Sequence, residues 1–284
     1  MRRAIQRTIL GCLFCVAAVA SASDVAATPV TDRFPEVASA YAVVIDDDLV
    51  WARELDTPHQ PASLAKLLSA LVLLDRNWDP ERIIAVSPGA AAIEGSQIGL
   101  RAGEQIRAAD ALTAMLVRSA NDACVALVEQ RSGNSAAFAI EMNRVAQRLG
   151  MRASRFVQPC GLDADGQYST VRDLLLLAHA AAGSTQIALR AGAQKATLTT
   201  RQGRRLDFHN SNALIGRDTR ARGLKSGYTS QAGRCLIALA EADGHRVMVV
   251  MLNAPDRWWG VTGVLDEAFR AARYKTLLEQ LKKP

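Results

Sequence analysis

The feature that most constrains this chain is an apolar segment, residues 60–74, that carries a serine and a lysine three residues apart. Residues 64–74 are apolar almost all round, which is typical of a buried helix, and Pro61 suits a first turn, where its missing N–H has no partner. Ser63 and Lys66 then share one helical face. A buried, neutral amine beside a hydroxyl makes an activated nucleophile. The alternative is a helix that Ser63 caps while Lys66 reaches solvent, and this segment alone does not decide.

The composition is that of an ordinary globular protein. The chain has 284 residues, of which 49% are hydrophobic, 22% charged and 5% aromatic. Its length fits one large domain or two small ones. The basic residues are scattered without interleaved aromatics, so we expect no nucleic-acid partner. The sequence has no metal- or phosphate-binding motif, and we expect neither a metal nor a cofactor.

The N-terminus has the pattern of a secretory signal peptide over residues 1–22. Arg2, Arg3 and Arg7 precede a short apolar run, and Ala20-Ser21-Ala22 is a small-x-small cleavage site. The run is too short for a convincing membrane span. Cleavage lowers the formal net charge of +6 by three, which suggests no particular partner. We therefore expect an exported protein, periplasmic or associated with the cell wall, with residues 23–36 as a flexible leader.

Three cysteines remain after residue 22, namely Cys124, Cys160 and Cys235. An odd number permits at most one disulfide and leaves one thiol free. The interpretation we prefer is that all three are small, buried apolar residues. A catalytic cysteine is disfavoured, because the four histidines show no pattern that pairs one with a thiol.

The order of predicted elements is strands, helices, strands and a helix, which indicates an α+β fold. We expect the strands at both chain ends to form one antiparallel sheet and residues of about 77–190 to form a mainly helical lobe. The Ser63 helix would lie at the seam between them, where clefts form. The predicted strands cover residues 40–46, 49–54, 196–200, 205–208, 223–229, 233–241 and 246–253. The predicted helices cover about 64–74, 113–117, 123–131, 138–150, 174–179 and 262–281.

The last predicted helix has one apolar face, and this face could cover the sheet or lie on a membrane. We expect it to cover the sheet, because a sheet face needs a partner layer. Its members are Val264, Leu265, Ala268, Phe269, Ala272, Leu277, Leu278 and Leu281.

Two further polar segments could carry chemistry, although each has an ordinary structural explanation. Ser119-Ala120-Asn121 lies between two apolar helices and could be only a helix cap. Lys225-Ser226-Gly227 begins a strand and could be only a solvated edge, although a glycine inside a strand often marks the close approach of a ligand or another backbone.

Together the three segments resemble a known family. Ser-x-x-Lys at Ser63, Ser-x-Asn at Ser119 and Lys-Ser-Gly at Lys225 occur in this order in the penicillin-recognising serine acyl-transferases. Longer stretches are similar to the low-molecular-mass penicillin-binding proteins that are serine-type D-alanyl-D-alanine carboxypeptidases. These stretches are residues 61–66, 95–104, 119–127, 161–170 and 223–229. The resemblance covers about residues 35–255. It implies a β-lactamase/DD-peptidase-like catalytic domain over residues 37–284.

The resemblance also implies a substrate and a nucleophile. The substrate is the peptidoglycan stem peptide that ends in D-Ala-D-Ala, and β-lactams should acylate the same serine. Ser63 attacks the penultimate D-Ala and Lys66 takes its proton. Ser119 relays a proton to the leaving amine, and Asn121 holds Lys66 and the substrate amide.

The remaining implied roles are in substrate binding. Lys225 and Ser226 bind the terminal carboxylate, Gly227 lets the substrate lie against the strand, and the N–H groups of Ser63 and Tyr228 form the oxyanion hole. The family usually has threonine where this chain has Ser226, and the hydroxyl is kept. Many members carry a second, β-rich domain and a C-terminal amphipathic anchor. Only some thirty residues follow the last predicted strand, which leaves no room for that domain and makes membrane attachment doubtful.

Three other functions use much the same residues. A D,D-endopeptidase that cuts peptidoglycan cross-links is the nearest alternative. A class A β-lactamase would carry a Glu-x-x-Leu-Asn segment, whereas Gly161-Leu162-Asp163 stands in that interval. A wall-binding protein with a vestigial site would bind muropeptides without turning them over.

Overall fold

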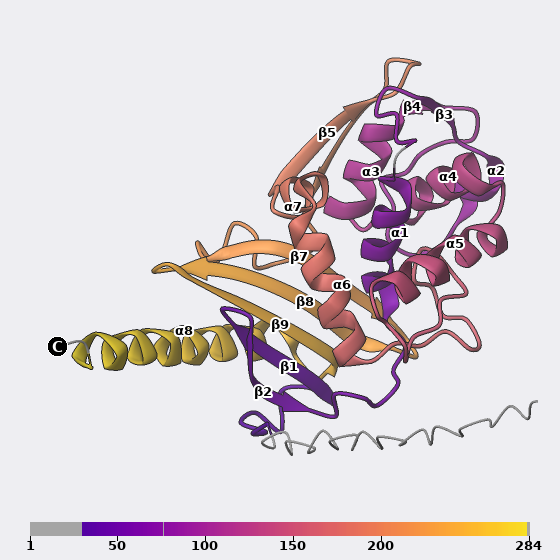
Figure 1. The fold of residues 1–284 in the computed structure, drawn as a ribbon. Coiled ribbons are helices and arrows are strands. Elements are labelled where there is room, and N and C mark those ends of the chain that lie inside the picture. The colour runs from indigo at the N-terminus through magenta and orange to yellow at the C-terminus, as the bar shows by residue number, and fades with distance from the viewer. Residues whose placement is uncertain (1–29, 76, 283–284) are drawn as a thin grey trace, which may run out of the picture.

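The computed structural model describes residues 30–75 and 77–282 (Figure 1). The predicted signal peptide and residues 23–29, half of the predicted leader, lie outside these residues. The described end of the leader lies against the sheet, because Thr31 pairs with Trp51 in an isolated bridge. Asp32 accepts hydrogen bonds there from Tyr41 and Arg53, each at 2.9 Å.

A five-stranded antiparallel sheet forms the centre of one lobe, with the strand order β2-β1-β9-β8-β7. The strands at the two ends of the chain meet in it, with Ala40 of β1 opposite Leu252 of β9. This confirms the predicted α+β fold. The strands are β1 (Ala40–Ile45), β2 (Asp48–Arg53), β7 (Ala221–Thr229), β8 (Gly233–Ala242) and β9 (His245–Ala254).

The hairpin between β8 and β9 turns at Asp243-Gly244. Both residues have positive φ, 54° and 79°, as the tight turns that match the twist of paired strands require. The hairpin therefore follows from the local sequence, whereas the pairing of β1 with β9 needs the whole chain.

Helix α8 (Arg257–Leu281) covers one face of the sheet (Figure 1). It begins five residues before the predicted start, because the Asp256 carboxylate accepts hydrogen bonds from the N–H groups of Trp258 and Trp259. The predicted apolar face packs only in part. Its first five members, from Val264 to Ala272, are buried as predicted. Leu277, Leu278 and Leu281 are exposed, because the helix extends beyond the sheet there. Within the described residues, no helix is both long and apolar enough to span a membrane.

The second lobe is helical and surrounds α1 (Ala65–Leu73), in which every residue except Leu71 is buried. This confirms the buried helix. Helix α6 contacts α1 and also the central strands β1 and β9, so it joins the two lobes. The other helices are α2 (Pro88–Ala92), α3 (Ala108–Val117), α4 (Asn121–Ser132), α5 (Ser135–Arg148), α6 (Val171–Gly183) and α7 (Thr185–Ala191).

Two small sheets complete this lobe, β3 (Ile83–Ala85) with β4 (Gln105–Arg107) and β5 (Lys195–Thr199) with β6 (Arg205–His209). The prediction that the strands after residue 195 all join one sheet is wrong for β5 and β6. They form a separate hairpin that packs on α3.

Candidate active site

Ser63 lies in a 3₁₀ turn, η1 (Ala62–Leu64), directly before α1. Two glycines from distant parts of the chain pack against this turn. A Cβ added to Gly227 would lie 2.8 Å from the Ser63 N atom, and one added to Gly161 would lie 2.1 Å from the Ala62 carbonyl oxygen. Only residues without a side chain fit at these two positions, so the backbone of β7 and the loop at Gly161 together fix the serine.

Lys66 is completely buried below Ser63. Its Nζ atom lies 3.1 Å from Ser63 Oγ and 2.7 Å from Asn121 Oδ1, and it also donates to the Cys160 carbonyl. Burial lowers the pKa of the Lys66 amine from its ordinary value of 10.5 to about 7, against the opposing charge of Asp122. A neutral amine has two hydrogens and one lone pair. The amide and the carbonyl can accept the two hydrogens, which leaves the lone pair for the Ser63 hydroxyl proton.

Asn121, the first residue of α4, is positioned at both ends of its side chain. Its Oδ1 atom accepts from Lys66, and its Nδ2 atom donates to the Glu94 carbonyl at 2.6 Å. A Cβ on Gly95 would lie 2.9 Å from this Nδ2 atom. The neighbouring Asp122 carboxylate is buried and accepts from the N–H groups of Ile98, Gly99 and Leu100. It therefore orders the loop beside the site and does not face the cavity.

Ser119 precedes α4 and has a φ of 65°, in the left-handed region that non-glycine residues rarely adopt. Such conformations cost of order 1–3 kcal/mol and are concentrated at functional sites. The side chain is largely buried and lines the same cavity as Ser63.

Lys225 is a second buried amine, on β7, and is only 1% exposed. Its Nζ atom donates to the Ser226 carbonyl at 2.8 Å. Burial lowers the pKa of Lys225 well below its ordinary value, and the positive charges of Lys66 and Arg257 lower it further. The Ser226 hydroxyl does reach the cavity, whereas the Lys225 amine does not line it.

The cation that lines the cavity is Arg257, which the sequence did not single out. It is the first residue of α8, and one of its terminal nitrogens donates to the Gly227 carbonyl. Its Nε atom is buried and has no hydrogen-bond partner. The signal that could have found it is Asp256, whose capping position places Arg257 in the first turn of a helix that starts at the end of β9.

These residues enclose a cavity of about 290 Å³ between the lobes. The structure brings six of the eight predicted site residues to its wall and places Lys66 and Lys225 beneath it. Ser211, also missed, lies with its Oγ atom 3.4 Å from that of Ser226. The wall consists of Ser63, Gly95, Ser96, Ser119, Asn121, Gly161, Leu162, Ser211, Ser226, Gly227, Tyr228, Thr229 and Arg257.

All three cysteines are buried, as expected, and they form the one disulfide that their odd number permits. Cys124 and Cys160 form a disulfide with a Cα–Cα distance of 5.9 Å, and Cys235 is a buried free thiol. The spacing in the sequence carries no signal for this pair, because the fold brings α4 and the Cys160 loop together.

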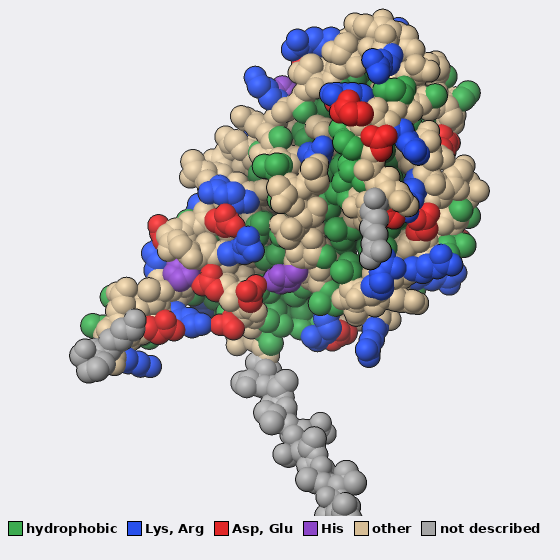
Figure 2. Space-filling model, turned by 45° about the horizontal axis from the view of Figure 1, so that its top comes forward, with side chains coloured by type: hydrophobic (Ala, Val, Ile, Leu, Met, Phe, Trp, Pro, Cys, Tyr) green, Lys and Arg blue, Asp and Glu red, His purple; other side chains and the backbone are tan. Residues whose placement is uncertain are grey.

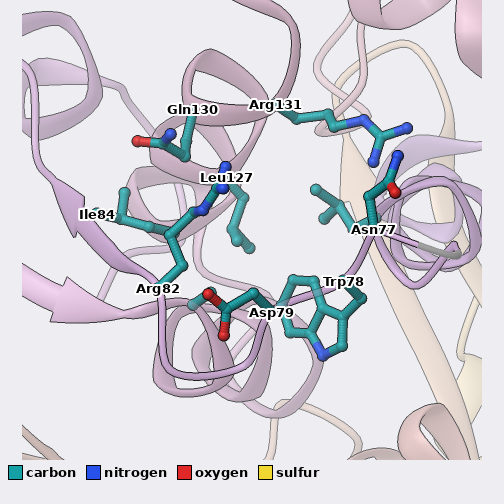
Figure 3. Close-up of a pocket in the computed structure, with 10 residues that line it drawn as sticks. Asn77, Trp78, Asp79, Arg82, Ile84, Leu127, Gln130 and Arg131 are labelled. Carbon is teal, nitrogen blue, oxygen red and sulfur yellow. The ribbon is translucent and has the colours of Figure 1, made fainter.

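A second hollow, of about 260 Å³, lies at the other end of α1 (Figure 3). The polar and aromatic side chains that line it are Asn77, Trp78, Asp79, Arg82, Gln130 and Arg131. It has no serine or lysine in its wall. Between residues 30 and 282, as far as the structure describes them, no three His, Cys, Asp or Glu side chains are grouped so that they could hold a metal ion.

Residues 27–256 match the family model for D-alanyl-D-alanine carboxypeptidase. The chain is 30% identical to the D-alanyl-D-alanine carboxypeptidase DacF of Bacillus subtilis over 83% of its own length and 62% of that protein. It is 31% identical to a D-alanyl-D-alanine endopeptidase of Pseudomonas aeruginosa over 77% of its length and 72% of that protein.

Solved structures show the same fold. A D-alanyl-D-alanine carboxypeptidase of Mycobacterium tuberculosis superposes with a TM-score of 0.76 at 26% identity, over 87% of this chain and 95% of that one. The fold is thus the DD-peptidase fold that the sequence predicts.

Proposed function

This chain belongs to the D-alanyl-D-alanine carboxypeptidase family, and we propose that it removes the terminal D-Ala from peptidoglycan stem peptides through an acyl-enzyme on Ser63. The observation that carries this proposal is the buried Lys66 amine, 3.1 Å from the Ser63 hydroxyl, with a pKa lowered to about 7. A base with a pKa near neutrality is the kind that general base catalysis favours.

The first step is attack of Ser63 Oγ on the carbonyl carbon of the penultimate D-Ala, while Lys66 takes the hydroxyl proton. The C–N bond to the last D-Ala then breaks, and a proton returns to the leaving amine through Ser119. Asn121 keeps Lys66 in place and offers its amide to the substrate. The backbone N–H groups of Ser63 and Tyr228 receive the oxyanion, an arrangement worth about 10²–10³ in rate. Water then hydrolyses the ester and frees the serine.

The terminal carboxylate of the substrate fits the end of the cavity where Ser226 and Arg257 lie. Arg257 lines the cavity here, and its guanidinium could hold a carboxylate through a charge-assisted hydrogen bond. Lys225 contributes from beneath the wall through its position and, when protonated, its charge. Strand β7 is the last in the order of the sheet, so an extended peptide can lie beside it as an added strand.

Acylation by a penicillin tests the nucleophile. Incubation should add one drug mass to the peptide that contains Ser63, and Ser63→Ala should take up none. If the wild-type protein takes up no label, the proposed function is wrong. If Ser63→Ala is still labelled, the nucleophile is another residue.

A D,D-endopeptidase is the second candidate, because the Pseudomonas aeruginosa relative bears that name. The two activities differ in the leaving group, which is free D-Ala in one case and a cross-linked stem peptide in the other. Purified protein should release D-Ala from a pentapeptide faster than it cleaves a cross-linked dimer. The reverse order would make it an endopeptidase, and rapid hydrolysis of the penicillin itself would make it a β-lactamase.

The proposed substrate also implies a place for the protein. Peptidoglycan lies outside the cytoplasmic membrane, which agrees with the signal peptide predicted over residues 1–22. We propose that residues 37–284 form the catalytic domain and act in the periplasm or at the cell wall.

A further inference from the structure

We propose that the Cys124–Cys160 disulfide positions the Lys66 amine, because it fixes the two groups that accept that amine's hydrogens at a set distance from each other. This inference rests on the proposed function of Ser63 and Lys66. It gives the two cysteines a part in the reaction, although neither touches the substrate.

The disulfide joins the two acceptors almost directly. Cys124 lies on α4 one turn after Asn121, whose Oδ1 atom is 2.7 Å from Lys66 Nζ. Cys160 supplies the second acceptor with its own carbonyl. The cross-link therefore runs from the helix that carries one acceptor to the residue that is the other.

The Cys160 segment has no secondary structure to hold it. It is an irregular loop tied down by side chains: Gln158 Oε1 accepts from the N–H of Cys160 at 2.7 Å, and Ser69 Oγ donates to the Pro159 carbonyl at 2.7 Å. The next residue, Gly161, packs against the backbone of Ala62 and Ser63. A shift of this loop would thus move the Cys160 carbonyl and release one side of the turn that carries the nucleophile.

The disulfide also keeps water away from the Lys66 amine. Both cysteines are buried, at 0% and 1% exposed, in the core that surrounds Lys66. If the loop and α4 separate, water reaches the amine, and the pKa of Lys66 rises toward its ordinary value because desolvation is what lowers it. The charged groups that face Lys66 are Asp122 on α4 and Lys225 on β7, and both remain in the variants below.

The test compares the full chain with the double variant Cys124→Ser/Cys160→Ser. The rate constant for acylation by a fluorescent penicillin is measured from pH 6 to pH 10, and circular dichroism gives the folded fraction. A catalytic group displaced by about 1 Å can cost about a hundredfold in rate. We expect acylation at pH 7 to fall tenfold to a hundredfold, with part of the rate recovered at higher pH. Cys235→Ser, which removes a buried thiol without breaking a cross-link, should leave both the rate and its pH dependence unchanged.

A double-mutant cycle separates positioning from general support of the fold. If the disulfide acts through Lys66 and its partners, its removal should cost less in an Asn121→Ala background than in the wild type. If the serine pair does not fold, Cys124→Val/Cys160→Ala keeps the site apolar and carries the same test.

Each outcome decides something different. A folded variant that is acylated at the wild-type rate with the wild-type pH dependence would overturn the proposal. So would costs that add in the Asn121→Ala background. A wild-type protein that takes up no penicillin would instead contradict the proposed function.

Discussion

The two ends of helix α1 present opposite chemistry. At its N-terminal end, Lys66 and Lys225 are buried amines with lowered pKa values, beside a serine. At its C-terminal end, the pocket in Figure 3 has Arg131 in its wall, and this arginine is paired with Asp75 at 2.6 Å and Glu141 at 3.0 Å. These two carboxylates raise the pKa of Arg131 above its ordinary value, whereas burial lowers that of Lys66.

The difference shows that the chemistry of a cavity depends on whether its basic side chains keep or lose their protons. A paired surface arginine keeps its proton at every accessible pH and can only bind. A buried amine without a carboxylate partner gives up its proton near neutrality and can act as a base. The protein surface resembles the C-terminal end of α1 in this respect. On the face shown in Figure 2, Lys and Arg side chains are interspersed with Asp and Glu.

Lys66→Arg should have the largest effect, because it puts an arginine at the N-terminal end of α1, as Arg131 is at the C-terminal end. A guanidinium does not deprotonate in a protein, so we expect acylation by penicillin to fall by about 10³-fold or more. Lys195→Arg, the same change on the exposed strand β5, is the control and should be neutral. Retention of more than a tenth of the rate in Lys66→Arg would show that Lys66 is not the base.

Gly227→Ala should cost about a hundredfold in acylation rate, since the added Cβ would lie 2.8 Å from the Ser63 N atom and displace the nucleophile. The matched control is Gly183→Ala at the end of α6, where an added Cβ meets nothing within 4 Å. The two rates, measured with folded protein, should differ by this factor. Equal rates would mean that the turn at Ser63 tolerates movement.

Arg257→Gln should lower kcat/KM for a D-Ala-D-Ala peptide by about tenfold to a hundredfold, the value of a hydrogen bond to a charged group. The loss should be much smaller for a substrate whose terminal carboxylate is amidated. Equal losses on both substrates would exclude carboxylate binding by Arg257.

The pH dependence of the wild type should show the lowered pKa of Lys66 directly. The neutral amine is the active form, so acylation should rise about tenfold per pH unit below pH 7 and level off above it. Stopped-flow fluorescence with a labelled penicillin measures this profile. A midpoint near 10 would mean that the amine is solvated in solution.

Arg131→Gln should have the smallest effect on activity. Its pairs with Asp75 and Glu141 lie near the surface, so we expect about 1 kcal/mol less stability and an acylation rate within about twofold of the wild type. Urea unfolding and penicillin labelling measure the two quantities. A large loss of acylation would connect the pocket in Figure 3 to the chemistry at Ser63.

The sequence predicted the parts of the site that local pattern determines. The apolar run after Ser63 predicted a buried helix, Asp243-Gly244 predicted a hairpin, and three short motifs predicted which segments meet. Arg257 was missed because it becomes part of the cavity only when the fold brings the first residue of α8 to the Gly227 carbonyl of β7. The disulfide was missed for the same reason, since nothing near Cys124 or Cys160 in the sequence specifies the other.

The pairing of β1 with β9 has a consequence for the timing of activity. In a growing chain β2 can pair with one edge of β1, but the other edge has no partner until residues 245–254 are available. The turn that carries Ser63 likewise lacks the strand that packs against it until β7 has formed. Contacts so distant in sequence form late and slowly, because a long loop must close first. A partly synthesised chain therefore has the serine and the lysine but not the enclosure that makes them reactive. Because of this strand order, Ser63 becomes reactive only when nearly the whole chain has been made and can fold.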